Sequence, residues 1–325
     1  MIGLSHWRRT RKTKATSLSH SHPQTLMRVG TRGSDLALAQ AHQVRDRLSD
    51  LHADSLDVKV EIIRTTGDDN LGPLAEIGGE GVFTAQLERA LLDGRVDVAV
   101  HSLKDLPTQL HPELELVATP ERADVRDVLI AAKATSIETL AENARLGSGS
   151  LRRQCQVLAL RPDLRFIAVR GNIGTRIAQA REGVVDGVLL AAAGLHRLGL
   201  EHEISCYLDT NQVLPAPGQA AIGLEMRQDD PLINFLRPLN HAATLASVIG
   251  ERSLLEALGG GCRAPIASWG RVVNDELLLD GLVGSTDGVR LIRESVVGAP
   301  ADAHDCGLRL AAELIRKGAH SLLPS

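Results

Sequence analysis

The chain has 325 residues, of which 43% are hydrophobic and 23% charged, and its net charge is −4. These values are typical of a globular protein with room for two or three domains. No apolar run approaches the roughly 18 residues that cross a bilayer, so no membrane partner is expected. With three Phe, two Trp and one Tyr, the chain also lacks the aromatic surfaces on which single-stranded nucleic acids stack.

The N-terminal stretch 1–27 differs in charge from the rest, because it contains basic side chains and no acidic one. Its basic residues are Arg8, Arg9, Arg11, Lys12 and Lys14. We expect residues 1–27 to be a disordered extension of a cytoplasmic protein, or to precede a true start at Met27. The same composition occurs in transit peptides, so an organelle is the alternative location.

Strands and helices alternate in the first part of the chain. Ser34 is a candidate helix cap, because Gln40, Val44 and Leu48 follow it at helical spacing. The expected elements are a strand at 28–31, a helix after Ser34, a strand at 58–65, a helix at 83–93 and a strand at 96–100. This alternation predicts a parallel sheet with crossover helices.

The alternation begins again after residue 125, and the last part of the chain has another pattern. The second stretch predicts strands at 127–131, 145–148, 165–169 and 184–191 and a helix at 151–159. The Pro/Gly-rich LPAPGQ at 214–219 marks a crossing or hinge. The last part predicts helices at 242–258 and 302–317 around β segments at 268–273, 276–285 and 289–298. The fold class is therefore α/β with two such units, followed by a small α+β unit.

Two motifs in the first unit carry candidate site residues. In GTRGSD, Arg32 and Ser34 lie at the start of a helix, where anions bind, although a plain cap with a surface arginine fits equally. In HSLKDLP, Lys104 and Asp105 follow a strand. Asp105 could act as a general acid–base or stabilise a developing cation, or the two side chains could form a solvated pair.

Two motifs in the second unit place arginines at strand ends. GSGSLRRQ leads into a helix that carries Arg152 and Arg153, and VRGNIGTR contains Arg170 and Arg176. Neither motif is a P-loop or a dinucleotide fingerprint. Because cations recur at strand ends in an otherwise acidic chain, we expect a small ligand with several carboxylates or phosphates, and no nucleic acid.

The stretch LGGGCRAPI places one thiol, Cys262, directly behind three glycines. The four cysteines lie far apart, which fits neither a disulfide framework nor a zinc site and favours a reducing compartment. A nucleophilic cysteine would need a base, and no histidine is adjacent. A covalent attachment point, a turnover nucleophile and a simple turn all remain open from this motif alone.

Seven short motifs taken together are far more specific than any one of them. They are, in order, GTRGS, TTGD, AVHSLKDLPT, GSGSLRRQCQ, RGNIGTR, LPAPGQAAIGLE and GGGCRAPI. In this combination the chain resembles the hydroxymethylbilane synthase family, also called porphobilinogen deaminase, from about Met27 to the C-terminus.

The resemblance implies two α/β domains shaped like periplasmic binding proteins and a small C-terminal α+β domain that bears the cysteine. The implied division is an extension at 1–27, domain 1 at 28–121 plus 220–239, domain 2 at 122–219 and domain 3 at 240–325. The resemblance also implies a monomer.

The family reaction joins four porphobilinogen molecules head to tail, with loss of ammonia each time, and water then releases linear hydroxymethylbilane. The resemblance implies a dipyrromethane cofactor, held by a thioether to the cysteine that matches Cys262, and no metal. Asp105 matches the catalytic aspartate, which stabilises electron-deficient intermediates and shuttles protons. The implied cofactor-binding residues are Lys104, Ser150, Arg152 and Arg153. The implied substrate-binding residues are Arg32, Ser34, Arg170, Arg176 and Gln219.

Some positions depart from the family pattern. Glu76 and Glu80 stand in AEIGGEGVF where lysines are common, so we assign them no binding role, and the behaviour of this loop stays open. Ala220 replaces a frequent glycine, with little expected effect. A two-lobed binding protein for a small polycarboxylate is the rival hypothesis, but it gives Cys262 no role. A cysteine acyl- or glycosyl-transferase is a third, but it lacks a marked base.

Overall fold

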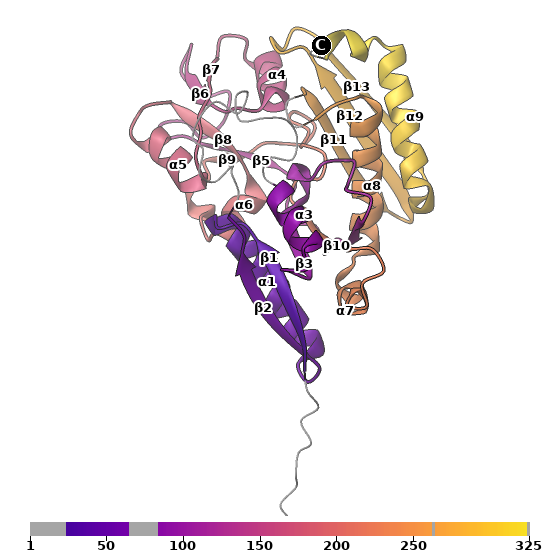
Figure 1. The fold of residues 1–325 in the computed structure, drawn as a ribbon. Helices are drawn as coiled ribbons and strands as arrows, with labels where there is room; N and C mark the ends of the chain where they lie inside the picture. Colours follow the sequence, from indigo (N-terminus) through magenta and orange to yellow (C-terminus); the bar gives the residue numbers. More distant parts are fainter. Residues whose placement is uncertain (1–23, 65–83, 262–263, 324–325) are drawn as a thin grey trace, which may run out of the picture.

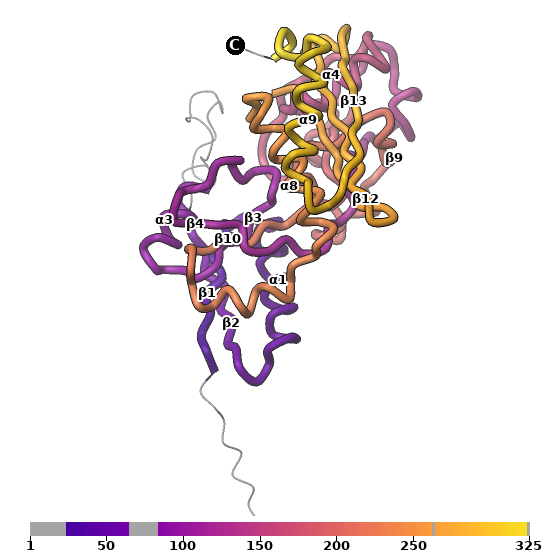
Figure 2. Tube along the Cα trace, turned by 90° about the vertical axis from the view of Figure 1, so that its right-hand side faces the viewer, coloured from indigo at the N-terminus to yellow at the C-terminus, as the bar shows by residue number. Residues whose placement is uncertain are grey.

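The protein consists of three units, each built on its own sheet (Figure 1). The computed structural model describes residues 24–64, 84–261 and 264–323. Two of the sheets have five strands and the third has three. Figure 2 shows the three-stranded unit, with α8 and α9, above the unit that holds β1 and β2. No helix within the described ranges has the length and apolar character to pass through a bilayer.

The first sheet mixes parallel and antiparallel strands in the order β2–β1–β3–β10–β4. Its strands are β1 (Thr25–Thr31), β2 (Leu56–Ile62), β3 (Val98–Ser102), β4 (Leu114–Ala118) and β10 (Ile222–Arg227). β1 runs parallel to β2 and β3, whereas β10 runs antiparallel to β3 and β4. A purely parallel sheet was therefore the wrong prediction. The reason is that β10 follows the whole second unit in the sequence. The alternation of strands and helices in the first part of the chain cannot predict that such a distant strand joins the first sheet.

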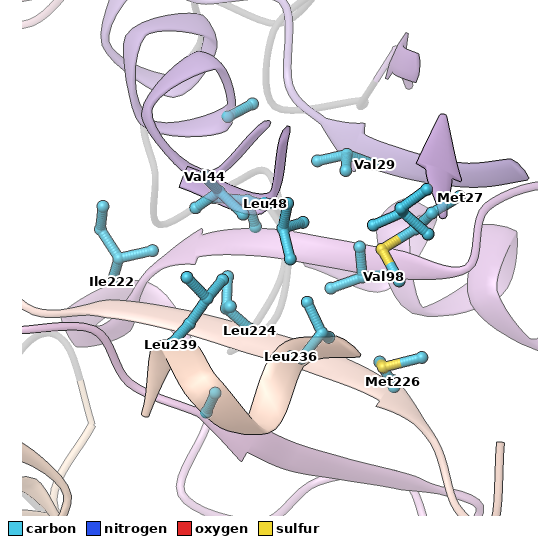
Figure 3. Close-up of a cluster of buried hydrophobic side chains, with 14 residues drawn as sticks. Met27, Val29, Val44, Leu48, Val98, Ile222, Leu224, Met226, Leu236 and Leu239 are labelled. Carbon is cyan, nitrogen blue, oxygen red and sulfur yellow. The ribbon is translucent and has the colours of Figure 1, made fainter. Parts of the chain in front are cut away.

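Helix α1 (Asp35–His52) forms where the sequence predicts it. The Ser34 hydroxyl accepts a hydrogen bond from the backbone N–H of Ala37 at 3.4 Å, which confirms the cap. Val44 and Leu48 are buried against the first sheet and against Leu236 of the short helix α7 (Ile233–Leu236), as Figure 3 shows. The predicted helix at 83–93 is α3 (Ala85–Leu92).

Residues 24–27 belong to the fold, so the predicted end of the extension at residue 27 is wrong. Gln24 Nε2 donates to the carbonyl of Ala53 at 2.7 Å, and Thr25–Met27 already pair with β2. The side chain of Met27 is fully buried in the core because it points to the helix-covered face of β1. Residues 1–23 lie outside the described part, and their interpretation stays a prediction.

The second sheet has the order β7–β6–β8–β5–β9 and is mixed as well. Its strands are β5 (Asp127–Ile130), β6 (Arg145–Gly147), β7 (Arg165–Ile167), β8 (Gly187–Ala191) and β9 (Cys206–Tyr207). Its helices are α4 (Leu151–Leu160), α5 (Ile173–Arg181) and α6 (Ala192–Arg197). β6 is parallel to β7 and β8, whereas β5 is antiparallel to β8 and β9.

Helix α5 was not among the predicted elements. The glycines of RGNIGTR indicated only a turn, but Asn172 caps a helix here by accepting from the N–H of Thr175 at 2.8 Å. The signal that could have identified α5 was Asn172, a favoured helix-cap residue, followed by apolar residues at helical spacing.

The third unit follows the sequence prediction closely. Its antiparallel strands β11 (Ile266–Val273), β12 (Glu276–Gly284) and β13 (Leu291–Gly298) are covered by α8 (Ala242–Ala257) and α9 (Ala303–Arg316). The two helices approach so closely that a Cβ on Gly307 would clash with the carbonyl oxygen of Gly250. The remaining short elements are η1 (Leu103–Asp105), η2 (Glu201–Glu203), η3 (Arg237–Leu239), η4 (Pro300–Asp302) and η5 (Ala319–Leu322).

Glu251 of α8 joins the two chain crossings between the sheets to the third unit. Its fully buried carboxylate accepts from both terminal nitrogens of Arg122 at 2.5 and 3.0 Å. It also accepts from the backbone N–H groups of Gly218 and Gly270, both at 2.6 Å. Arg122 lies in the crossing from the first sheet to the second, and Gly218 in the crossing back, the LPAPGQ segment. One carboxylate therefore links all three units.

The return crossing contains an unfavourable backbone position. Ala220 has a φ of 69°, in the left-handed region where glycine is favoured. The expectation that alanine in place of glycine has little effect here must therefore be corrected. The alanine carries a strain of about 1 kcal/mol.

We expect Glu251→Gln to lower the free energy of unfolding by about 3–5 kcal/mol, because the buried Arg122 guanidinium loses its counter-charge. Urea unfolding measures this. Asp186→Asn is the matched control, because Asp186 pairs with Arg145 on the surface and such pairs contribute little. Equal effects of both substitutions would contradict the role of Glu251 as the link between the units.

Candidate functional site

β3 carries the chain to Asp105 through a single turn of 3-10 helix, η1. The N–H of Leu103 bonds to the carbonyl of Ala221 at 3.0 Å, which fixes the turn to the start of β10. Leu103 is buried, Lys104 is half-buried and Asp105 is exposed. The turn thus anchors its apolar residue in the core and presents the carboxylate at the strand end.

A cavity of about 80 Å³ opens beside Asp105, between the start of α1, the end of β3 and Thr84. It brings together three predicted site residues, Arg32, Ser34 and Asp105. It also contains His101 and Ser102, which the sequence analysis did not single out. A guanidinium, three hydroxyls and a carboxylate in one recess can bind a small polar ligand that carries both an acid group and N–H donors.

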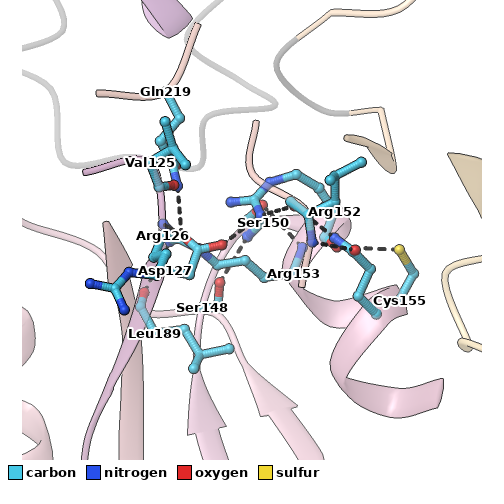
Figure 4. A network of polar contacts seen from close by, with 12 residues as sticks. Val125, Arg126, Asp127, Ser148, Ser150, Arg152, Arg153, Cys155, Leu189 and Gln219 are labelled. Carbon is cyan, nitrogen blue, oxygen red and sulfur yellow. Dashed lines mark hydrogen bonds and ion pairs between the residues drawn. The ribbon is translucent and has the colours of Figure 1, made fainter. Parts of the chain in front are cut away.

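The motif GSGSLRRQ forms the end of β6 and the start of α4. The Ser150 hydroxyl caps α4 by accepting from the N–H of Arg153 at 3.4 Å. Arg152 and Arg153 point inward and both contact Asp127, the first residue of β5 (Figure 4). Arg152 Nη1 lies 2.5 Å from one carboxylate oxygen, and Arg153 Nε and Nη2 lie 3.0 and 2.8 Å from the other.

Asp127 is the centre of this network and was missed by the sequence analysis. Its carboxylate has no exposure, and it also accepts from Nε2 of Gln219 at 3.0 Å. Burial alone would raise the pKa of Asp127, but the guanidiniums of Arg152 and Arg153 hold it well below its usual range. The only sequence signal was an acidic residue that opens an otherwise apolar strand, DVLI.

Lys104 of the first unit and Arg176 of the second unit interact electrostatically with this cluster and with Asp105. Burial lowers the pKa of Lys104, Arg152 and Arg153 lower it further, and Asp105 and Asp127 oppose them. Burial also lowers the pKa of Arg176, with Arg153 adding to this and Asp105 opposing it. Cations from both units therefore act on one another and on Asp105, as the strand-end argument predicted.

Other predicted residues lie at the margin of the site or outside the described part. Arg170 is exposed after β7, before α5. Gln219 is fully buried, and its Nε2 also donates to the carbonyl of Val125 at 2.8 Å. Cys262, the TTGD segment at 65–68 and the Glu76 and Glu80 loop lie outside the described residues, so their predicted roles stay predictions.

Arg197 of α6 is a further buried cation that the sequence analysis did not single out. Burial lowers its pKa to about 10, which leaves it charged at neutral pH. Its Nη2 donates to the carbonyl of Ala220 at 2.7 Å, beside the return crossing. Among the described carboxylates none forms an ion pair with it, and burial is the cause of its pKa shift.

A larger cavity of about 450 Å³ lies between the 121–126 crossing, the start of α8 and β11, and contains none of the predicted site residues. Each arginine that lines it is already paired with a carboxylate. These pairs are Arg122–Glu251, Arg126–Asp124 and Arg271–Asp280. The smaller cavity, which contains Asp105, is therefore the candidate site.

We expect Asp127→Asn to lower the free energy of unfolding by about 3–5 kcal/mol at neutral pH, since two buried guanidiniums lose their carboxylate. The folded-state pKa of Asp127 is depressed, so its contribution is present above the unfolded pKa near 4 and is lost as the pH falls below it. Urea titrations should therefore show a constant difference in the free energy of unfolding between wild type and variant from about pH 5 to 7. This difference should become smaller below about pH 4. A gap independent of pH in acid would contradict this account.

Comparison with known proteins identifies the family of this chain. The family profile described as "Porphobilinogen deaminase, dipyromethane cofactor binding domain" matches residues 27–234. The one described as "Porphobilinogen deaminase, C-terminal domain" matches residues 245–316. A porphobilinogen deaminase of Roseiflexus castenholzii is 46% identical over 297 residues, which cover 91% of this chain and 97% of that protein. One of Syntrophobacter fumaroxidans is 44% identical over 300 residues, which cover 92% and 97%.

Among solved structures, a periplasmic substrate-binding protein of an ABC transporter from Coxiella burnetii overlaps 68% of this chain and 94% of its own, at 14% identity and a TM-score of 0.41. The sequence relatives and the two family profiles show that this chain belongs to the porphobilinogen deaminase family.

Proposed function

We propose that the protein is a transferase that condenses four porphobilinogen molecules head to tail and releases linear hydroxymethylbilane. Membership of the porphobilinogen deaminase family supports this function. The observation that carries it is the exposed carboxylate of Asp105, next to a recess that contains Arg32, within electrostatic range of Lys104 and Arg176. A two-lobed binding protein would need the cations but not this carboxylate.

Each condensation breaks the C–N bond of an aminomethyl group, releases ammonia, and forms a C–C bond to the pyrrole that ends the growing chain. The α-carbon of that pyrrole, which forms the new bond, then loses its proton and the ring becomes aromatic again. We propose Asp105 as the catalytic residue, because a carboxylate at this point can stabilise the positive charge that develops on a pyrrole and can accept that proton.

We propose that the carboxylates of the pyrroles are bound by the cations that the two units bring together. Arg32 and Ser34 line the recess beside Asp105, and Arg176 lies within electrostatic range of Asp105. These residues, with Arg170, are proposed to hold the substrate and the growing chain. Gln219 faces the Asp127 carboxylate, so we propose that it orients the cluster rather than a ring.

The described residues fit a dipyrromethane cofactor, which the matched family profile names. Arg152 Nε is buried without a hydrogen-bond partner among the described residues, and the cationic cluster has capacity for further acids. We propose that Lys104, Ser150, Arg152 and Arg153 hold the cofactor carboxylates and that Cys262 is its attachment point. When bound, the cofactor supplies the pyrrole to which the first substrate is joined.

We also propose the domain division 28–121 plus 220–239, 122–219 and 240–325, with the first domain extended to include β1 from Thr25. The separate sheets support it, since β10 returns to the first sheet. We also propose that the protein is a monomer, as the family resemblance implies, and that it is located in the cytoplasm. The free thiols of Cys155, Cys206 and Cys306 are consistent with a reducing compartment.

Intact-protein mass tests the cofactor. Protein from cells that make porphobilinogen should carry an adduct of two pyrrole units, and Cys262→Ser should remove it because the thioether cannot form. Cys206→Ser, a change at a half-buried thiol outside the site, should keep the adduct. An unmodified mass for the wild type would favour a binding protein instead.

Asp105→Asn tests the catalytic carboxylate. We expect turnover to fall by about 10²–10⁴-fold, since the amide keeps the shape but can neither accept a proton nor offset a positive charge. The mass should still show the adduct, which separates catalysis from cofactor attachment. Asp93→Asn, at the exposed end of α3, should leave turnover unchanged. Near-normal turnover of Asp105→Asn would refute the proposed role.

A further inference from the structure

One face of α8 contacts the segment that contains Asp105. Val248, Arg252 and Glu256 recur at a spacing of four residues, so they form a single stripe along the helix. Each of them meets a different part of the segment 103–110, which follows β3. The contacts run in the same order along both segments, so α8 supports the whole length of the segment 103–110.

The first contact is apolar. Val248 packs in a cluster with Leu103, Leu106 and Ala221, all buried. Leu103 and Leu106 flank Lys104 and Asp105 in the sequence. The turn therefore packs on α8 through the two residues on either side of Lys104 and Asp105.

The second contact is made by Arg252. Its Nη1 donates to the carbonyl of Leu106 at 3.0 Å, and its Nη2 donates to those of Pro107 and Thr108 at 2.6 and 3.1 Å. One planar guanidinium thus binds three consecutive carbonyls of another unit, directly after Asp105. Hydrogen bonds from a charged donor are stronger than neutral ones, and the fork fixes direction as well as distance.

Two carboxylates act electrostatically on the Arg252 guanidinium. Burial lowers the pKa of Arg252, whereas Glu225 and Glu256 act in the opposite direction. Glu225 of β10 also bonds to Nε2 of His101 at 2.9 Å, on the strand that leads into the turn. The backbone is therefore held before Asp105 through His101 and after it through Arg252.

The third contact closes the stripe. Gln109 Nε2 donates to Glu256 at 3.1 Å, near the C-terminal end of α8. In the sequence, α8 is followed directly by LGGGC. The helix that holds the Asp105 segment is thus also the helix from which the chain continues to Cys262.

We propose that Arg252 is a positioning residue for Asp105: by binding the carbonyls of Leu106, Pro107 and Thr108 it fixes the turn that presents the catalytic carboxylate. This inference rests on the proposed function for its consequence in catalysis. A carboxylate that shifts by about 1 Å can lose on the order of 10²-fold in rate. Arg252 does not touch the substrate, so its loss should act on turnover rather than on binding.

The chain contains a matched control. Arg293 of β13 also binds two consecutive carbonyls of another unit, with Nη1 to Asn211 at 2.6 Å and Nη2 to Thr210 at 3.3 Å. Those carbonyls lie in the second unit and not beside Asp105. Arg252→Met and Arg293→Met therefore remove the same kind of contact, and only the first removes it from the Asp105 segment.

The experiment measures kcat and KM for porphobilinogen, the adduct mass and the melting temperature of both holoenzymes. We expect Arg252→Met to lower kcat by about 10²-fold, with KM changed less than about three-fold and the adduct retained. Arg293→Met should keep kcat within about two-fold, with a comparable fall in melting temperature. Equal kcat values for the two variants would overturn the inference.

Arg252→Lys serves if Arg252→Met does not fold, because it keeps the charge and the apolar stem but replaces the fork by a single ammonium. We expect a loss of about ten-fold in kcat, between wild type and Arg252→Met. A wild-type kcat for Arg252→Lys would contradict the requirement for the fork.

Hydrogen exchange provides a readout that does not depend on activity. The amides of 103–110 should exchange faster in Arg252→Lys or Arg252→Met than in wild type, and should be unchanged in Arg293→Met. Unchanged exchange in the Arg252 variants overturns the inference. A wild type that forms no hydroxymethylbilane but shows faster exchange in these variants would refute the proposed function and leave the positioning contact supported.

Discussion

Buried carboxylates allow this protein to gather positive side chains in one place. Like charges repel, and a guanidinium removed from water is costly unless a counter-charge and hydrogen bonds replace the solvent. Asp127 meets that requirement for Arg152 and Arg153, with Gln219 on the same carboxylate. Because one carboxylate faces two guanidiniums, the cluster remains positive and can accept an acidic ligand.

Contacts between the units include both buried polar groups and small apolar clusters, whereas each unit has an apolar core of its own. Most of the large clusters of buried side chains lie within a single sheet and its helices. Smaller clusters cross between units, such as the one around Val248 and the one around Cys155. The rest of the junction depends on directional bonds made by Glu251 and Arg252. Directional bonds fix the relative orientation of the units more narrowly than a small apolar interface would.

The chain path explains why the turn that carries Asp105 lies beside the crossings between the units. β3 and β6 both end at this junction, and the crossings that connect the sheets pass beside them. A Cβ on Gly218 would lie 3.1 Å from the backbone nitrogen of Lys104, so the return crossing runs directly against the Asp105 turn. Residues from a strand end, a helix start and a crossing thus meet without any one segment carrying the whole site.

The sequence by itself determined many of the local elements, the helix cap at Ser34, the family, and the strand-end positions of Asp105 and the arginines. These depend on periodicity, capping and short motifs, which act over a few residues. Tertiary structure alone decided that β10 inserts antiparallel between β3 and β4, that Met27 belongs to the core, that Asp127 pairs with Arg152, and that Arg252 binds backbone carbonyls after Asp105. The physical reason is that a buried ion pair or a guanidinium–carbonyl contact forms between segments that are distant in the sequence. A local pattern of residue types does not show which of these segments come together in the fold.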